Sequence, residues 1–234
     1  IGTVASQTAD IAIGANAAAN GTDTPAGSSN GQNAGTAISI GANSVATGIA
    51  TTALGEAAHA TQNGAVAVGS KANATNKAAA ALGRDSNASG ESSTALGSGA
   101  NASGQYSFAG SVKAKASGLQ SIAIGRNAEA SAEQSLAQGS SAKATAKDTV
   151  AVGTEANATA LNAIAIGKNA NASGASSISI GQNTVTTGSA TAALGYNVTA
   201  TGTNATAVGS YGNASGNNSI TVGSANASGS SSTA

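Results

Sequence analysis

The chain has 234 residues, of which 32 are glycine, nine are basic and nine are acidic, while aromatic residues make up 2% and Cys, Met and Trp are absent. This composition excludes a core of large side chains, a disulfide framework, a cysteine zinc site and a thiol nucleophile. The balanced charge also excludes a broad basic field for nucleic acid. The remaining options are low-complexity disorder and a strict repeat that makes a thin core sufficient.

The first repeats lie near the N-terminus and enclose a surplus segment. The step from Gly14 to Gly41 is almost twice as long as the regular step between the glycines that follow. The surplus lies at about 22–34 and contains Pro25, the chain's single proline. We predict a loop insertion there, within one domain spanning 1–234 whose coils run from about 10 to 229.

From Gly41 to Gly223 an apolar-small-apolar-glycine motif recurs with a period of 14, as at 38–41, 66–69, 122–125 and 164–167. One copy, 108–111, ends in Ser111 instead of glycine. A repeat of 14 is too short for a helical hairpin but accommodates two short strands and two turns. The sequence therefore predicts an all-β fold, a parallel β-solenoid with one coil per repeat, in which the glycines supply turns with positive φ.

Strand side chains alternate between two faces, so each column of the repeat can be assigned a side. In the first strand we predict that Ile122 and Ile124 point inward and Ala123 points outward. In the second strand, the alanine columns that include Ala72 and Ala74 are predicted to point inward. This assignment puts Gly110, Ser111 and Gln138 in core columns, so the segment 108–138 is expected to be the least well packed.

Charged residues one repeat apart become neighbours in such a stack, and opposite charges there are mildly favourable. Lys71 is expected above Asp85 and Lys77 above Glu91. Glu133 is likewise expected above Lys147.

The sequence contains no catalytic or metal-binding constellation, so we expect no enzyme, no metal and no cofactor. His59 is predicted to be a solvated surface residue. A column of hydroxyls that includes Thr61, Thr75 and Ser89 could order water, as in ice-binding solenoids, but the column beside it is chemically mixed. Stacked Asn73, Asn87 and Asn101 indicate an amide ladder.

The first-strand column predicted to face outward consists of small residues in every coil. A solvated face has no need to exclude long side chains, whereas a face packed against another backbone does. We therefore predict parallel association of chains through this column, with these candidates for the contact face: Ala67, Ala81, Ala95, Ala123, Ala151, Ala165 and Ala193.

The copies at 121–125, 170–174 and 218–223 resemble the head repeats of trimeric autotransporter adhesins, specifically the YadA-like head. The resemblance covers roughly residues 10–229. It implies a left-handed parallel β-roll, a homotrimer, and display on a Gram-negative outer surface through an outer-membrane anchor. The neck, stalk and anchor of such proteins are not found in this sequence. Family heads bind host matrix proteins or promote aggregation and surface attachment.

The leading hypothesis is a non-enzymatic adhesive head, without nucleic acid or direct membrane contact. Tyr196 and Tyr211, predicted to be exposed on neighbouring coils, are the candidate ligand-binding residues. The alternatives are a passive rigid spacer within a fibre and an ice-binding solenoid. A hexapeptide acyltransferase needs longer coils and an active-site histidine, and a calcium-stacked solenoid needs more Asp.

Overall fold

The computed structural model describes residues 2–5, 10–21 and 36–234, and these residues form short strands and turns without a helix. The strands alternate between two parallel sheets, because each strand pairs with the next but one along the chain. The chain is therefore an all-β parallel β-solenoid, which confirms the predicted fold class. It divides into two compact units, unit 1 (Ile1–Ser117) and unit 2 (Gly118–Ala234).

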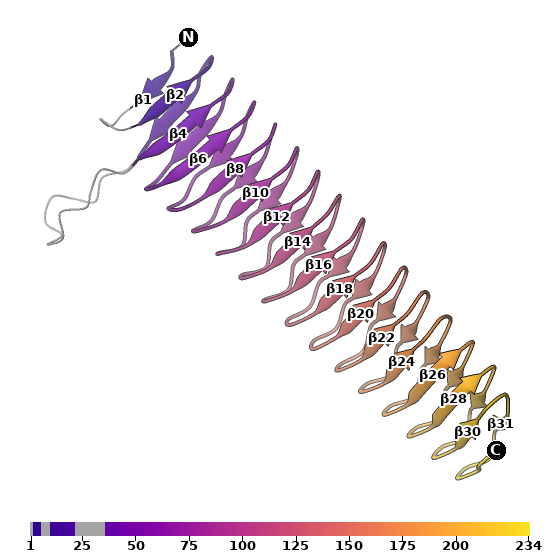
Figure 1. Cartoon of the computed structure of the whole chain (residues 1–234). Coiled ribbons are helices and arrows are strands. Elements are labelled where there is room, and N and C mark those ends of the chain that lie inside the picture. Colours follow the sequence, from indigo (N-terminus) through magenta and orange to yellow (C-terminus); the bar gives the residue numbers. More distant parts are fainter. Residues whose placement is uncertain (1, 6–9, 22–35) are drawn as a thin grey trace, which may run out of the picture. The chain divides into compact units, whose positions relative to one another are not determined.

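In unit 1 the odd-numbered strands form one sheet and the even-numbered strands form the other (Figure 1). The odd-numbered strands are β1 (Val4–Ala5), β3 (Ala18–Asn20), β5 (Val45–Thr47), β7 (His59–Ala60), β9 (Asn73–Ala74), β11 (Asn87–Ala88), β13 (Asn101–Ala102) and β15 (Lys115–Ala116). The even-numbered strands are β2 (Ile11–Ile13), β4 (Ala37–Ile40), β6 (Thr51–Leu54), β8 (Val66–Val68), β10 (Ala80–Leu82), β12 (Thr94–Leu96) and β14 (Phe108–Gly110).

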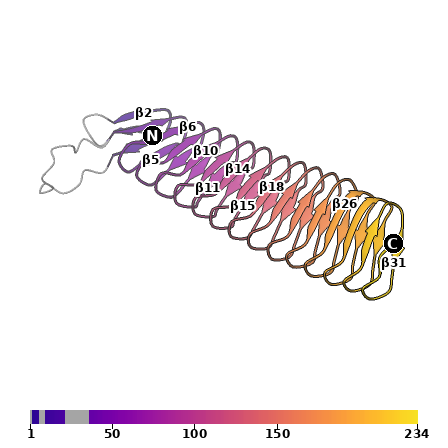
Figure 2. The same ribbon diagram turned by 60° about the horizontal axis from the view of Figure 1, so that its bottom comes forward.

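Unit 2 repeats the same two-sheet arrangement (Figure 2). Its odd-numbered strands are β17 (Glu129–Ala130), β19 (Lys143–Ala144), β21 (Asn157–Ala158), β23 (Asn171–Ala172), β25 (Val185–Thr186), β27 (Thr199–Ala200), β29 (Asn213–Ala214) and β31 (Asn226–Ala227). Its even-numbered strands are β16 (Ile122–Ile124), β18 (Leu136–Gln138), β20 (Val150–Val152), β22 (Ile164–Ile166), β24 (Ile178–Ile180), β26 (Ala192–Tyr196), β28 (Thr206–Ser210) and β30 (Ile220–Val222).

The ladder register follows the predicted period of 14, as in the pairing of Ala67 with Ala81. Near the N-terminus the step is longer, because Ile11 pairs directly with Ile38. The loop predicted at 22–34 lies outside the described residues. At the edges of this segment, the Asp10 carboxylate accepts hydrogen bonds from Gly21 N at 3.1 Å and Ala37 N at 2.9 Å. The last step is one residue shorter, with Asn213 paired to Asn226.

The interior of each coil is built from small side chains alone, with the exception of Val198. One coil places four alanines at 0% exposure, Ala72, Ala74, Ala79 and Ala81. The second-strand prediction, with Ala72 and Ala74 inward, is thus confirmed. Several buried serines and threonines in equivalent columns donate their hydroxyl to the backbone carbonyl three residues back, as Ser93 Oγ donates to Gly90 O at 2.7 Å. Hydrogen bonds of this kind let a polar side chain replace alanine in a dry interior.

The predicted orientation of the first strand is wrong. Ala123 is 0% exposed, whereas Ile122 and Ile124 are 38% and 39% exposed. A coil this short, which already encloses three small columns, leaves no space for isoleucine in the fourth. Gly110 and Gln138, which were expected in a core column, therefore also lie on the outer face. Ser111 was expected in a core column too, but it follows β14 and lies in the turn, with φ 140°.

The glycines that recur once per repeat from Gly41 to Gly223 have the predicted positive φ, for instance 134° at Gly153. Coil stacking imposes a second requirement there. A Cβ on Gly153 would lie 2.5 Å from Gly167 O of the next coil. The turn thus needs glycine both for its backbone angle and for the close approach of the neighbouring backbone.

Candidate functional site

An apolar stripe of two columns runs over the outer face of the even-numbered strands. In unit 1 the first column contains Ile11, Ile38, Thr52, Val66, Ala80, Thr94 and Phe108, and the second contains Ile13, Ile40, Leu54, Val68, Leu82, Leu96 and Gly110. In unit 2 the first column contains Ile122, Leu136, Val150, Ile164, Ile178, Ala192, Thr206 and Ile220, and the second contains Ile124, Gln138, Val152, Ile166, Ile180, Leu194, Val208 and Val222.

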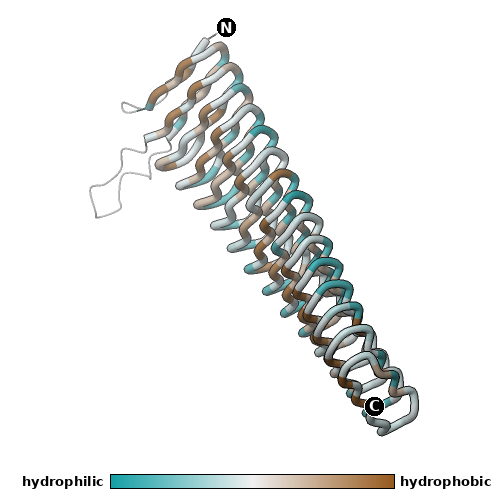
Figure 3. The backbone as a smooth tube through the Cα atoms, turned by 45° about the vertical axis from the view of Figure 1, so that its right-hand side comes forward, coloured by the Kyte–Doolittle hydropathy of each residue, from teal (hydrophilic) through white to brown (hydrophobic). Residues whose placement is uncertain are grey.

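The stripe carries no charged side chain at any of these described positions. Figure 3 shows hydrophobic residues recurring at one place in successive coils of each unit. Soluble proteins rarely leave large contiguous apolar patches open to water, and such patches mark interaction surfaces. The stripe is therefore the strongest candidate contact surface on this chain.

The seven alanines predicted to form the contact face lie elsewhere. Each of them is 0% exposed inside its coil. Their side chains consequently have no surface to offer a second chain. The sequence analysis placed these alanines on the outer side of the even-numbered strands, and their burial shows that they point inward.

The odd-numbered strands present a polar face. Asn73 Nδ2 donates to Asn87 Oδ1 at 3.1 Å, and Asn87 Nδ2 donates to Asn101 Oδ1 at 3.3 Å, which confirms the predicted amide ladder. His59 is exposed on the same face, as predicted. The two sheets thus differ sharply: one is polar outside and the other is apolar outside.

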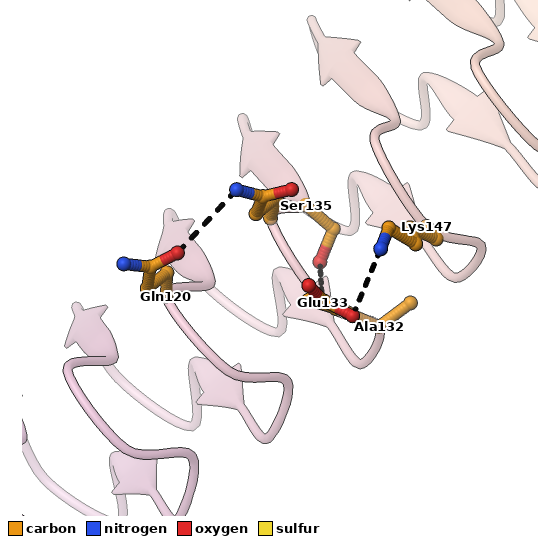
Figure 4. Close-up of polar contacts among 6 residues, drawn as sticks. Gln120, Ala132, Glu133, Ser135 and Lys147 are labelled. Atoms are coloured by element: carbon orange, nitrogen blue, oxygen red, sulfur yellow. Dashed lines mark hydrogen bonds and ion pairs between the residues drawn. The ribbon is translucent and has the colours of Figure 1, made fainter.

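The predicted charge pairs are borne out in part. In unit 2, Lys147 Nζ lies 3.2 Å from Glu133 Oε2 between adjacent coils (Figure 4). In unit 1, Asp85 instead lies 3.7 Å from Arg84, and Glu91 accepts a hydrogen bond from Gln105. Within the described ranges, Lys71 and Lys77 form no ion pair with their predicted partners.

Tyr196 and Tyr211 lie together in unit 2. Their ring centroids are 5.5 Å apart in an edge-to-face arrangement with an interplanar angle of 85°. Their exposed fractions are 40% and 63%. Here β26 and β28 extend past the usual strand end, and Tyr211 N donates to Tyr196 O at 2.9 Å. The two residues form an exposed aromatic pair, and aromatic residues are enriched at binding hot spots.

The remaining polar groups do not converge. The described residues include no group of three or more His, Cys, Asp or Glu side chains able to hold a metal ion. Ser141, Lys143, Glu155 and Asn157 line a hollow of about 340 Å³ in unit 2, with one cation and one carboxylate at its edge. No helix within the described ranges has the length and apolar character needed to traverse a bilayer.

Comparison with known families matches the YadA head domain repeat over 33–72, 74–109 and 112–224, in overlapping two-copy segments. No curated protein matches the chain. YadA head repeats are typical of trimeric autotransporter adhesins, surface proteins anchored in the outer membrane, and the head itself is a non-enzymatic structural domain. The match extends over well more than half of the sequence, and the chain belongs to the YadA head domain family.

Proposed function

We propose that this chain is the adhesive head of a trimeric fibre on a Gram-negative surface. In this proposal it attaches the cell to host matrix proteins, to host cells or to abiotic surfaces, and it promotes aggregation between cells. The observation that carries the proposal is the run of YadA head repeats over most of the chain.

The apolar stripe supports the trimeric part of the proposal. Three parallel chains that turn their stripes toward a common axis would remove these side chains from water, leaving the polar sheets outside. Full burial of one aliphatic side chain stabilises by about 1.5–3 kcal/mol, and the stripe offers such side chains in nearly every coil. The stripe replaces the alanine face as the proposed contact surface.

Light scattering tests the trimer directly. We expect a mass three times that of the 21.5 kDa chain. Ile166→Asp, which puts a carboxylate into the stripe, should give a β-rich monomer because a buried unpaired charge is costly. Asn157→Asp, on the polar sheet, is the matched control and should stay trimeric. A wild-type monomer at micromolar concentration would contradict the trimer.

For adhesion, we propose that the Tyr196–Tyr211 pair contributes to ligand contact. Binding of the full chain to immobilised collagen, fibronectin and polystyrene should fall about tenfold or more when both tyrosines become alanine, as for a hot spot. Tyr106→Ala is the matched control, because Tyr106 is 53% exposed and lies in unit 1, away from the pair along the sequence. Equal binding by the double variant and the wild type would remove the pair from the site.

A passive spacer is the second candidate function. The observation that favours it is the near-uniform surface of the coils, with few aromatic residues to serve as binding anchors. A spacer predicts that none of the three surfaces binds the isolated head. Binding to any of them that depends on the tyrosine pair would rule the spacer out.

A further inference from the structure

Gln138 is an exception within the apolar stripe. At the described positions of the second column, it is the one polar side chain among Ile, Leu, Val and Gly. It pairs with Ile124 on one side and with Val152 on the other. The side chain is exposed, and its amide forms no hydrogen bond within the part of the chain that the structure describes. An apolar contact surface gains nothing from an amide at this position. The presence of Gln138 therefore needs a physical reason.

The partner that fits the stripe is another copy of the same chain. Apolar side chains recur once per coil, and parallel neighbouring strands lie about 4.8 Å apart. An occupant must therefore present apolar side chains at this same spacing along many coils. A second copy of the chain does so, and the absence of charge from the described stripe removes any electrostatic obstacle to self-contact.

A contact surface that repeats in every coil does not by itself determine how two copies of the chain align along their length. If one copy slips by one coil along its neighbours, nearly every apolar side chain still meets an equivalent one from an adjacent repeat. Apolar packing in the middle of the stripe therefore discriminates weakly between the aligned and the slipped assembly. Between the two ends of the stripe, only a residue that differs from the rest of its column can favour the aligned assembly over the slipped one.

Gln138 has the chemistry to discriminate. In the aligned assembly three Gln138 side chains meet at one level, and each amide can donate to one neighbour and accept from the other. After a slip of one coil, a Gln138 amide faces Ile124 or Val152 of a neighbour and loses its partners. A desolvated amide without partners is strongly disfavoured. A single polar residue in an apolar seam fixes the register of coiled coils by the same principle.

We propose that Gln138 sets the axial register in which copies of this chain associate. This inference rests on the trimer proposed above and adds to it the residue that aligns the three chains. Gln138 is a positioning residue, whose apolar replacement should leave folding and assembly intact while loosening the alignment. Valine is the natural replacement, because it already occupies the same column at Val152.

Engineered disulfides measure the register, since the chain has no cysteine of its own. Two differently tagged full-length chains are produced together and oxidised. When both carry Val152→Cys, aligned chains form disulfides between the two tags. When one carries Val152→Cys and the other Ile166→Cys, the disulfide requires a slip of one coil. The ratio of slipped to aligned disulfides is the readout.

With Gln138 in place we expect aligned disulfides and few slipped ones. Gln138→Val should raise the ratio of slipped to aligned disulfides at least about fivefold, since the penalty on the lone amide is gone. Asn157→Val is the matched control: it is the same kind of amide-to-valine change, but on the polar sheet, in a column that already contains Val185, and it should leave the ratio unchanged. Light scattering on every sample checks that assembly persists.

The failure modes are distinct. If wild-type chains give a monomer mass and no aligned disulfides, the proposed trimer fails. If aligned disulfides form and the ratio is the same for the wild type and Gln138→Val, the trimer stands and the register role of Gln138 is overturned.

Discussion

The glycine position of each repeat is held in a backbone conformation that favours glycine. From Gly41 to Gly209 the φ angles of these glycines lie between 125° and 140°, and Ser111 occupies the equivalent position with φ 140°. Side chains of L-residues fit poorly there, and such residues store strain of about 1–3 kcal/mol. Ser111 is therefore a local weak point of unit 1.

Ser111→Gly should stabilise the protein. We expect the free energy of unfolding to rise by about 1 kcal/mol, because relief of strain outweighs the entropy that glycine loses on folding. Ser98→Gly is the matched control: Ser98 lies in the preceding turn without positive φ, and its change should lower stability slightly. Thermal unfolding followed by circular dichroism measures both. A less stable Ser111→Gly variant would show that the serine is not strained.

This turn was predictable from sequence because only one residue type suits it, so glycine marks the period. Two other positions in each coil also have positive φ, and no single residue type marks them. Asn43, Ala57 and Lys71 occupy one of these columns, with φ of 57°, 52° and 58°. The stacking of coils imposes the left-handed conformation on whatever residue is present, so its identity varies. Tertiary context overrides local preference at these sites.

At the scale of the strand, alternation shows that Ile122 and Ile124 share a face opposite Ala123, but it does not say which face is inside. The usual rule that large apolar residues are buried led to the wrong choice. The signal that distinguishes the inner from the outer face is how much the residue type varies within a column. The two exposed columns contain Thr94, Gln138 and Gly110, whereas the interior column between them holds only Ala, Ser or Thr. A narrow interior accepts only small side chains, while a surface position accepts side chains of different size and polarity.

Substitutions at adjacent positions of β20 test this orientation. Ala151→Leu puts a large side chain into an interior site with 0% exposure and should destabilise by about 1–3 kcal/mol or more. Val152→Leu, on the outer face of the same strand, should change stability by about 0.5 kcal/mol or less. Leucine already occupies that outer column at Leu82 and Leu194.

Chemical unfolding of the two variants beside the wild type provides the measurement. The opposite orientation, with alanine outside, predicts the reverse ranking: a tolerated Ala151→Leu and a harmful Val152→Leu. A result in that order would refute the placement of alanine in the interior.

At the scale of the whole molecule, each unit is a stack in which a coil contacts its neighbours, and the same few interactions recur. In such repeat proteins, stability is approximately the sum of the repeats and their interfaces. One coil can therefore be removed if every remaining column stays aligned. Joining Asn157 directly to Ala172 meets this condition, because Asn157–Ala158 and Asn171–Ala172 are equivalent pairs in the ladder.

Deletion of 158–171, one full repeat, should leave a folded protein. The loss of one coil should lower the free energy of unfolding by only about 1 kcal/mol, a shift in Tm of about 2–4 °C. Deletion of 158–170, one residue fewer, leaves Asn157 followed by Asn171 and adds a residue to that coil. A shift of one residue turns interior side chains outward, so the cost should be about 2 kcal/mol or more.

Thermal unfolding of the two deletion variants tests whether the fold requires a repeat of 14 residues, since the variants differ in length by one residue. The chain's own short step, Asn213 to Asn226, falls in a turn, where Gly223 has φ 85° rather than the angle near 130° of its counterparts. A change in length is thus absorbed where backbone angles can adjust, and the deletion of 158–170 falls in a strand instead. Equal melting temperatures for both deletions would show that the strands, too, can absorb an extra residue. The strict period of the repeat would then be a property of the sequence that folding does not require.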